Sequence, residues 1–328
     1  MKRIMVAVIT VLVFAWSAVP VRPPYASDAP LPEPVVFGEG VISTGDYDLN
    51  SAFTPDGKTV YFTKSAQSGG SLVAGRLAVI VFSQFRKGKW QMPEVASFSG
   101  QYNDYDPFVT ADGAKLFFTS DRPAPGKEKR DFDIWYVEKT VSGWSEPRNA
   151  GPPVNSVANE FYPSVARDGT LYFGSDRAGG AGGSDIYRAR FVDGNYTGPE
   201  NLGPSINTES YENDNYIAPD QSWLVFASTR PGGLGDNDLY ISYNENGSWT
   251  KAKNLGAPIN SAGREFCPMG SPDGKYFFFT STRSIPVKDR SSRLNYRELR
   301  RLLDGPGHGF GTIYQVDMDA VHRAGRGQ

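Results

Sequence analysis

Short runs of apolar and aromatic residues alternate with polar turns along the chain, and this pattern returns five times. Each copy has an apolar segment, a turn built around an aspartate, and a second segment in which nearly every position is apolar. Aspartate suits such turns because its side chain bonds to nearby backbone, and the glycine that usually follows tolerates positive φ. An apolar residue at nearly every position indicates a strand buried on both faces. The five segments are residues 53–63, 109–119, 165–174, 217–227 and 270–280.

Further features recur in phase with the turn in most copies. A Ser-Asp-Arg or Ser-Thr-Arg triplet and a loop follow the second strand, and a third short strand follows the loop. A glycine ahead of an aromatic residue, as in Gly247-Ser248-Trp249, then opens a fourth strand. Four short strands in each repeat are typical of a propeller blade, so we predict an all-β fold. The turn aspartates lie 56, 56, 52 and 53 residues apart, at Asp56, Asp112, Asp168, Asp220 and Asp273.

The two ends of the repeat region predict how the ring closes. The last copy has a third strand at residues 313–317 but no fourth strand after it. Residues 33–43, near the N-terminus, have the pattern of a fourth strand and linker without the three strands before them. We therefore expect the N-terminal strand to complete the last blade, giving one propeller of five four-stranded blades over residues 33–318. Six blades are the alternative, and they would require a copy that we do not find.

The repeat resembles that of the TolB-type family of WD-repeat-like propellers. The resemblance is carried by the Pro-Asp-Gly-Lys turns at 55–58 and 272–275, the run from Ser175 to Tyr187, and the Asn-Leu-Gly linker at 201–203. It covers residues 33–318 and implies periplasmic binding or scaffolding more than catalysis. The first copy departs from the pattern, with Thr63-Lys64-Ser65 in place of the arginine triplet. No α/β segment like that of TolB itself precedes the repeats, so we expect a relative that lacks this domain.

The N-terminus has the layout of a secretory signal peptide. Lys2 and Arg3 precede an apolar run over residues 4–15, and small residues and prolines follow. The run is shorter than the ~20 residues of a membrane span. We therefore expect a signal over residues 1–27, cleaved between 17 and 27, and a periplasmic or secreted monomer with no transmembrane segment. The net charge of −2 offers no basic excess for nucleic acid, and the single cysteine excludes an internal disulfide.

An acidic residue stands eight positions before each turn aspartate, and in a ring these acids would surround one mouth of the channel. Together with two acids that follow them and one histidine, they are the candidate ligand-binding residues: Asp48, Asp104, Asp106, Glu160, Glu212, Asp214, Glu265 and His308. In one interpretation each ring acid pairs with a loop arginine and ties neighbouring blades together. In the other, uncompensated acids bind a cation or a polyhydroxy ligand. The loop arginines are Arg122, Arg177, Arg230 and Arg283.

The first blade is where a cation would be sought, because Lys64 and Ser65 replace the loop arginine there. Calcium takes six to eight oxygen ligands from several chain segments. Weak calcium candidates are Asp46, Asp48, Asp104 and Asp106. The sequence contains no twelve-residue calcium loop, and no other cofactor is expected.

The last blade contains an insertion over residues 284–309. Leu294, Leu299, Leu302 and Leu303 fall at helical spacing within it, and Gly305-Pro306 ends the predicted helix. We expect a lid whose leucines pack on the acidic face. The candidate residues for contact with a partner are Arg293, Arg297, Arg300 and Arg301. Residues 319–328, which include His322, are expected to form a flexible tail.

No catalytic motif is recognised. The chain has two histidines and neither a Gly-x-Ser-x-Gly motif nor a zinc-type cluster of histidines and cysteines. The leading hypothesis is a non-enzymatic propeller that binds an envelope protein or a glycan polymer through its loop-rich face. The alternative is a carbohydrate-binding or glycoside-active protein that uses the acidic channel mouth, because paired carboxylates can hydrolyse glycosides.

Overall fold

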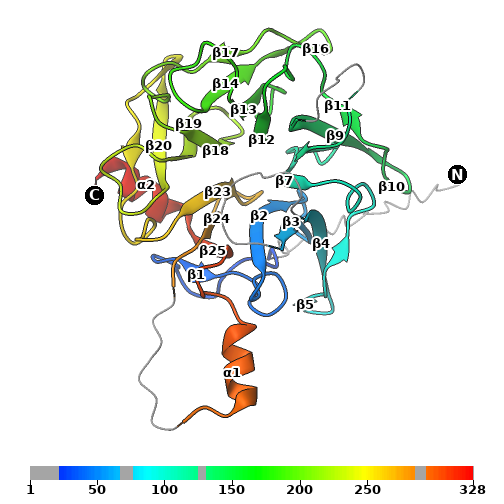
Figure 1. Ribbon diagram of the computed structural model, residues 1–328, viewed down its shortest axis with the longest axis vertical. Helices are drawn as coiled ribbons and strands as arrows, with labels where there is room; N and C mark the ends of the chain where they lie inside the picture. The colour runs from blue at the N-terminus through cyan, green and yellow to red at the C-terminus, as the bar shows by residue number, and fades with distance from the viewer. Residues whose placement is uncertain (1–21, 67–76, 125–130, 285–292, 328) are drawn as a thin grey trace, which may run out of the picture.

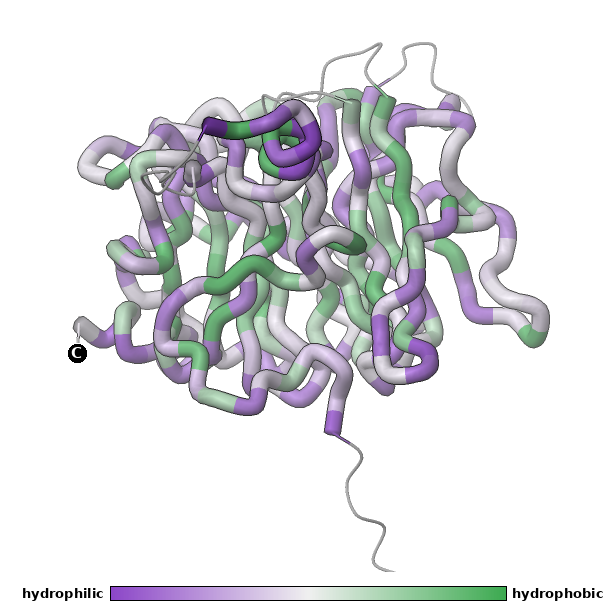
Figure 2. The backbone as a smooth tube through the Cα atoms, turned by 90° about the horizontal axis from the view of Figure 1, so that it is seen from below, coloured by the Kyte–Doolittle hydropathy of each residue, from purple (hydrophilic) through white to green (hydrophobic). Residues whose placement is uncertain are grey.

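The computed structural model describes residues 22–66, 77–124, 131–284 and 293–327. Five β-sheets surround a central axis and form a five-bladed propeller, as predicted (Figure 1). Figure 2 shows the disc from its side, with apolar residues concentrated along the strands and polar residues frequent in the loops above and below.

Each blade begins with its innermost strand, and in the first, second and fourth blades the outer edge is divided between two short strands. The first blade contains β2 (Tyr47–Phe53), β3 (Thr59–Ser65), β4 (Ala78–Arg86), β5 (Lys89–Trp90) and β6 (Glu94–Val95). The second contains β7 (Asp104–Val109), β8 (Lys115–Ser120), β9 (Asp133–Thr140), β10 (Gly143–Trp144) and β11 (Arg148–Asn149). The third contains β12 (Glu160–Val165), β13 (Leu171–Ser175), β14 (Asp185–Ala189) and β17 (Glu200–Asn201), with a hairpin of β15 (Phe191–Val192) and β16 (Asn195–Tyr196).

The last two blades follow the same plan. The fourth contains β18 (Glu212–Ile217), β19 (Trp223–Ser228), β20 (Asp238–Glu245), β21 (Ser248–Trp249) and β22 (Lys253–Asn254). The fifth contains β23 (Glu265–Gly270), β24 (Tyr276–Ser281), β25 (Thr312–Asp317) and β1 (Val35–Val36). The two helices are α1 (Tyr296–Leu303) and α2 (Met318–Arg326).

The second strand of every blade supplies the core between sheets. One phenylalanine recurs at the same position in all five, and each copy is almost fully buried. Burial on both faces explains why these strands are apolar at nearly every position. The five residues are Phe62, Phe118, Phe173, Phe226 and Phe279.

The N-terminal strand closes the ring, as predicted. β1 lies antiparallel to β25, with Val35 opposite Gln315. Tyr25, upstream of β1, is buried against the ring of Phe53 at 5.0 Å between centroids, and its carbonyl accepts a 2.7 Å hydrogen bond from the Gln315 side chain. Tyr25 therefore belongs to the folded domain, although it falls inside the range 1–27 expected for the signal. Residues 1–21 of that range lie outside the described residues.

A β-bulge interrupts every innermost strand at the same place. The register between first and second strand shifts by one residue in each blade, for example between Leu49 and Ala52. The first residue of each bulge has a positive φ, between 47° and 63°. We call these five residues the inner ring: Asn50, Asp106, Tyr162, Asp214 and Cys267.

Two expectations for the C-terminal part are wrong. The leucines of the insertion do not pack as a lid: Leu294, Leu299, Leu302 and Leu303 are 36–50% exposed, and α1 projects from the propeller (Figure 1). Residues 319–326 are not a flexible tail, because they continue α2, whose Met318 and Val321 are buried.

In the described ranges no helix is long and apolar enough to cross a membrane.

Candidate functional site

The five predicted acids form a ring at one end of the channel, and all five carboxyls are paired. We call Asp48, Asp104, Glu160, Glu212 and Glu265 the outer acid ring; each residue is 0% exposed. Four of them pair with the predicted loop arginine, and in the first blade Lys64 takes the arginine's place. The distances from the nitrogen to the carboxyl oxygen are 2.6 Å for Lys64–Asp48, 2.8 Å for Arg122–Asp104, 3.0 Å for Arg177–Glu160, 3.1 Å for Arg230–Glu212 and 3.3 Å for Arg283–Glu265.

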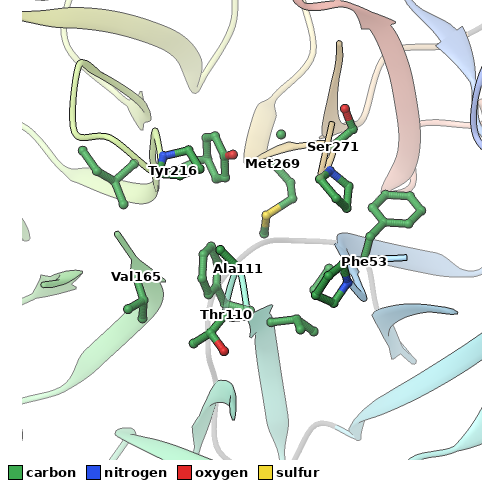
Figure 3. Close-up of a pocket in the computed structure, with 15 residues that line it drawn as sticks. Phe53, Thr110, Ala111, Val165, Tyr216, Met269 and Ser271 are labelled. Carbon is green, nitrogen blue, oxygen red and sulfur yellow. The ribbon is translucent and has the colours of Figure 1, made fainter. Parts of the chain in front are cut away.

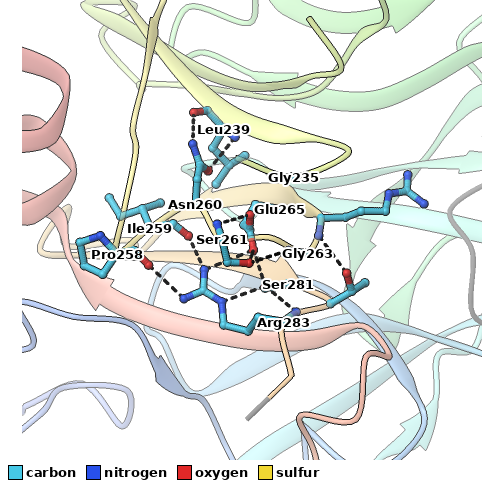
Figure 4. A network of polar contacts seen from close by, with 12 residues as sticks. Gly235, Leu239, Pro258, Ile259, Asn260, Ser261, Gly263, Glu265, Ser281 and Arg283 are labelled. Carbon is cyan, nitrogen blue, oxygen red and sulfur yellow. Dashed lines mark hydrogen bonds and ion pairs between the residues drawn. The ribbon is translucent and has the colours of Figure 1, made fainter. Parts of the chain in front are cut away.

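The same arginines tie the second to the fifth blade to the linker that precedes each of them. Figure 4 shows this in the last blade, where Arg283 donates to Glu265, to Ser281 Oγ and to the carbonyls of Pro258 and Ile259. The equivalent Arg230 lies over the Tyr240 ring, 4.6 Å from its centroid. The outer acid ring is therefore engaged in holding blades together, which was the first of the two sequence interpretations.

Three of the four weak calcium candidates already contact a cationic side chain. Asp46 and Asp48 both contact Lys64, and Asp104 contacts Arg122. Burial raises the pKa of Asp104, while Arg122 and two serine hydroxyls act in the opposite direction. Only Asp106 of the four lacks an ion-pair partner among the described residues, and it belongs to the inner ring, two positions further along β7.

The inner ring surrounds a cavity of about 10 Å³ on the channel axis. Ligand atoms of Asp106, Asp214 and Cys267 lie within 4.8 Å of one another, and Cys267 Sγ is 3.4 Å from Asp214 Oδ1. Burial raises the pKa of Asp214 to about 7. Burial and the neighbouring Asp214 hold the pKa of Asp106 well above its usual range, and burial does the same for the Cys267 thiol.

Sequence reasoning included Asp106 and Asp214 among its candidates but missed Cys267 and Asn50 as site residues. All four lie two positions after an outer-ring acid, so their phase in the repeat was visible. The bulge that brings them to the axis was not. In the described part of the chain neither Asp106 nor Asp214 forms an ion pair, which distinguishes them from the outer acid ring.

A larger pocket lies at the other end of the innermost strands, beside the Asp-Gly turns (Figure 3). Its volume is about 230 Å³, and every blade contributes to its wall. We call it the mouth pocket; the lining residues that matter below are Phe53, Phe108, Thr110, Tyr216, Met269 and Ser271.

A second pocket of about 220 Å³ opens between the second and third blades. It shares Thr110, Ala111 and Val165 with the mouth pocket, so the two pockets adjoin, and we call the pair the mouth groove. The residues that distinguish this flank pocket are Asp112, Lys115, Phe117, Arg167, Phe191 and Tyr196. None of the groove residues was predicted as a site residue, because the candidates from the sequence lie at the acidic end of the channel.

The remaining candidates lie on the surface. His308 is exposed, contacts the carbonyl of Leu302, and is not among the residues that line the three cavities described above. Arg293, Arg297, Arg300 and Arg301 are all exposed, and Arg300 pairs with Asp304. Contact between these arginines and a partner stays a prediction.

Comparison with known proteins finds only distant structural matches. No protein-family model matches it, and no curated protein does. An enzyme from a compost metagenome, named as a β-xylosidase/α-arabinofuranosidase, matches with a TM-score of 0.49 and 11% identity, over 87% of this chain and 94% of the other. The α-L-arabinofuranosidase of Lactobacillus brevis matches with a TM-score of 0.48 and 12% identity, over 85% and 92%. That of Podospora anserina gives 0.44 and 11%, over 88% and 94%.

At this low identity and similarity these matches decide nothing about function. The arrangement of the chain's own sheets shows a five-bladed β-propeller. The propeller implied by the TolB-type resemblance is thus confirmed by the arrangement of the sheets, whereas membership of the TolB-type family is not, since no family model matches the chain.

The leading functional hypothesis needs correction. It described a non-enzymatic propeller that binds an envelope protein or polymer, whereas the three matched proteins are named as arabinofuranosidases, one of them also as a xylosidase. That hypothesis is contradicted, and the findings agree better with the carbohydrate-directed alternative. The structure moves the alternative away from the outer acid ring, because those carboxyls already have cationic partners.

Proposed function

We propose that the protein binds a carbohydrate in the mouth groove. The observation that carries the proposal is the make-up of the groove: aromatic and apolar walls from five blades, with hydroxyl and charged groups at the rim. A sugar ring presents C–H groups on its faces and hydroxyls around its edge. Binding sites for such small molecules combine apolar walls with a few placed polar groups.

The mouth pocket supplies fixed aromatic surfaces. Phe53 and Tyr216 line it from different blades, and Met269 extends into it between them (Figure 3). Tyr216 is held against Gly270, where an added Cβ would lie only 2.3 Å from the tyrosine hydroxyl oxygen. Because the ring is held in this way, it needs no reordering when a ligand arrives, which reduces the entropic cost of binding.

The flank pocket supplies a second position with more polar groups. Phe191 is 40% exposed and packs against Tyr196, with ring centroids 5.1 Å apart. Lys115 lies over the Phe191 ring at 5.9 Å, and Asp112 and Arg167 also line the pocket. Together the two pockets reach the range of about 300–1,000 Å³ typical of small-molecule sites. Two adjoining pockets of similar size suit an oligosaccharide of at least two sugar units.

The proposal concerns binding and assigns no hydrolytic role to Asp106 and Asp214. Glycosidases use two carboxyl groups that flank the bond they cleave. The cavity between these aspartates is about 10 Å³, which is close to the smallest space that holds a water molecule and far too small for a sugar.

A thermal-shift screen tests the proposal. The panel contains xylotriose and cellotriose, which are bound in two of the matched structures, and arabinose-containing oligosaccharides. A ligand at a hundred times its Kd stabilises the folded protein by about 2.7 kcal/mol, so we expect the Tm to rise by several degrees with at least one sugar.

The matched variants are Phe191→Ala and Phe310→Ala. The two phenylalanines are 40% and 41% exposed, but only Phe191 lines the groove. Loss of an aromatic contact worth about 0.5–1.5 kcal/mol should weaken binding about two- to tenfold in Phe191→Ala and leave Phe310→Ala unchanged. No shift with any sugar, or equal effects of both variants, would count against the proposal.

A further inference from the structure

The inner ring holds three side chains of the types that ligate metal ions, and the proposed sugar site does not use them. Asp106, Asp214 and Cys267 come from the second, fourth and fifth blades, and each is 3% exposed. One ligand atom from each lies within 4.8 Å of the other two. Residues from three separate blades thus converge on one point of the channel axis.

Two further atoms at this point are buried acceptors without a donor. Asn50 Oδ1 and Asp106 Oδ2 have no hydrogen-bond partner in the described structure, and their residues are 5% and 3% exposed. Both residues line the same cavity of about 10 Å³. Buried polar atoms normally have a partner, so an exception indicates a missing ion or water.

The chemistry of the surrounding groups favours a cation over a water molecule. The cavity collects two carboxyls, an amide oxygen and a sulfur beside the Tyr162 and Asn215 side chains, and neither carboxyl has an ion-pair partner among the described residues. A water molecule can donate only two hydrogen bonds and brings no charge. A divalent cation satisfies all the acceptors and removes the repulsion between the two aspartates.

We propose that the inner ring binds one divalent transition-metal ion of the zinc type through Asp106, Asp214 and Cys267, with Asn50 Oδ1 as the fourth ligand. A thiolate among carboxylate and amide oxygens suits zinc or cobalt, whereas calcium and magnesium take oxygen ligands alone. Binding releases the thiol proton and any carboxyl proton to solvent, because only the deprotonated groups ligate the metal.

The distance between Cys267 Sγ and Asp214 Oδ1 agrees with a zinc site. A tetrahedral zinc ion with bonds of about 2.3 Å to sulfur and 2.0 Å to oxygen holds these atoms about 3.5 Å apart. Cys267 Sγ and Asp214 Oδ1 are 3.4 Å apart. In the metal-free protein the same distance serves a hydrogen bond from the thiol to the carboxyl.

A route for the ion leads through Met269, which lines both the inner cavity and the mouth pocket. Methionine is unbranched and adaptable, so its side chain can move aside. The metal site goes beyond the proposed function and does not depend on it, because its ligands lie behind the mouth groove.

The test uses the full mature chain, stripped with a chelator and titrated with Co²⁺ and Zn²⁺. Cys267 is the only cysteine, so a sulfur-to-cobalt charge-transfer band in the near ultraviolet reports this residue alone. We expect the band to saturate at one equivalent of Co²⁺ and Zn²⁺ to raise the Tm by several degrees. Cys267→Ser should abolish the band, and Asp214→Asn or Asp106→Asn should weaken Zn²⁺ binding at least tenfold.

Asp236→Asn is the matched control, since Asp236 is exposed in the same blade as Asp214. It should bind both metals as the wild type does. If chelator-treated wild-type protein keeps its circular dichroism spectrum but shows neither the band nor a Tm shift, the proposal is overturned. The cobalt band and the Tm shift are measured on the wild-type protein, so they test the proposal even if a variant fails to fold. Sugar titrations in chelator keep the two proposals separate, because the groove should bind carbohydrate without metal.

Discussion

The pairing of the outer acid ring predicts a large difference between two arginine substitutions in the second blade. Arg122 donates to Asp104 Oδ1 at 2.8 Å, to Ser120 Oγ at 2.9 Å and to the carbonyl of Phe98 at 3.1 Å. Replacement by methionine fills similar space but leaves the carboxyl of Asp104 buried, with hydroxyl donors only. Removing one partner of a buried ion pair costs about 3–5 kcal/mol, so Arg122→Met should lower the free energy of unfolding by that amount.

The control is Arg148→Met. Arg148 also pairs with an acid, Glu138, at 2.9 Å, but its side chain is 59% exposed. Exposed pairs contribute about 0–1 kcal/mol, so this variant should be nearly neutral. The double variant Arg122→Met with Asp104→Asn should recover part of the loss, because it removes the unpaired charge.

Equilibrium unfolding in urea, followed by circular dichroism, measures the wild type, these three variants and the single variant Asp104→Asn. If Arg122→Met costs no more than Arg148→Met, the buried pairs do not hold the blades together. If the double variant loses the sum of the Arg122→Met and Asp104→Asn effects, the two groups act independently and the argument from pairing fails.

Three further predictions concern the closure of the ring and the joints between blades. Tyr25→Ala should cost about 3–5 kcal/mol, because a buried aromatic ring is lost from the closure; a Tm equal to that of the wild type would place residue 25 outside the fold. Burial and the nearby Arg326 lower the pKa of His322, so the unfolded chain binds more protons below about pH 6.5. Stability should therefore fall as the pH drops through this range, and His322→Gln should flatten the dependence of Tm on pH between 5 and 8. Gly182→Ala should lower the Tm, because its Cβ would lie 1.9 Å from a backbone oxygen, whereas Gly198→Ala, with nothing within 4 Å, should not.

Most of the fold could be predicted from the repeat. Five copies in constant phase predicted the blades, and an unmatched strand at each end predicted the closure between β1 and β25. The pairing of acids with loop arginines was also predictable, because both recur at fixed positions and must therefore meet in each of the four blades that have the arginine. Asp104 with Arg122 is the most buried example.

What the sequence did not predict depends on geometry that the repeat does not encode. The bulge that brings Cys267 and Asn50 to the axis changes the register by one residue, without a glycine or proline common to all copies to mark it. The mouth groove is assembled from turns of five blades, so no single stretch of sequence displays it.

The two helices show that residue spacing can predict a helix without predicting what the helix packs against. The leucine spacing of α1 predicted a helix correctly but could not say what the leucines contact, and the structure leaves them exposed. For α2, Met318 and Val321 stand three residues apart, and Gly327 ends the helix in the left-handed conformation. This spacing and the terminal glycine are signals of a packed helix, and the expectation of a flexible tail did not take them into account.

The most direct test of the proposed function is a crystal structure of the protein soaked with the sugar that gives the largest Tm shift. Our account predicts electron density for the sugar in the mouth groove, with one ring against Phe191 and Tyr196 or against Phe53 and Tyr216. A sugar bound instead at the outer acid ring, or a groove without sugar at a concentration that saturates the thermal shift, would contradict it.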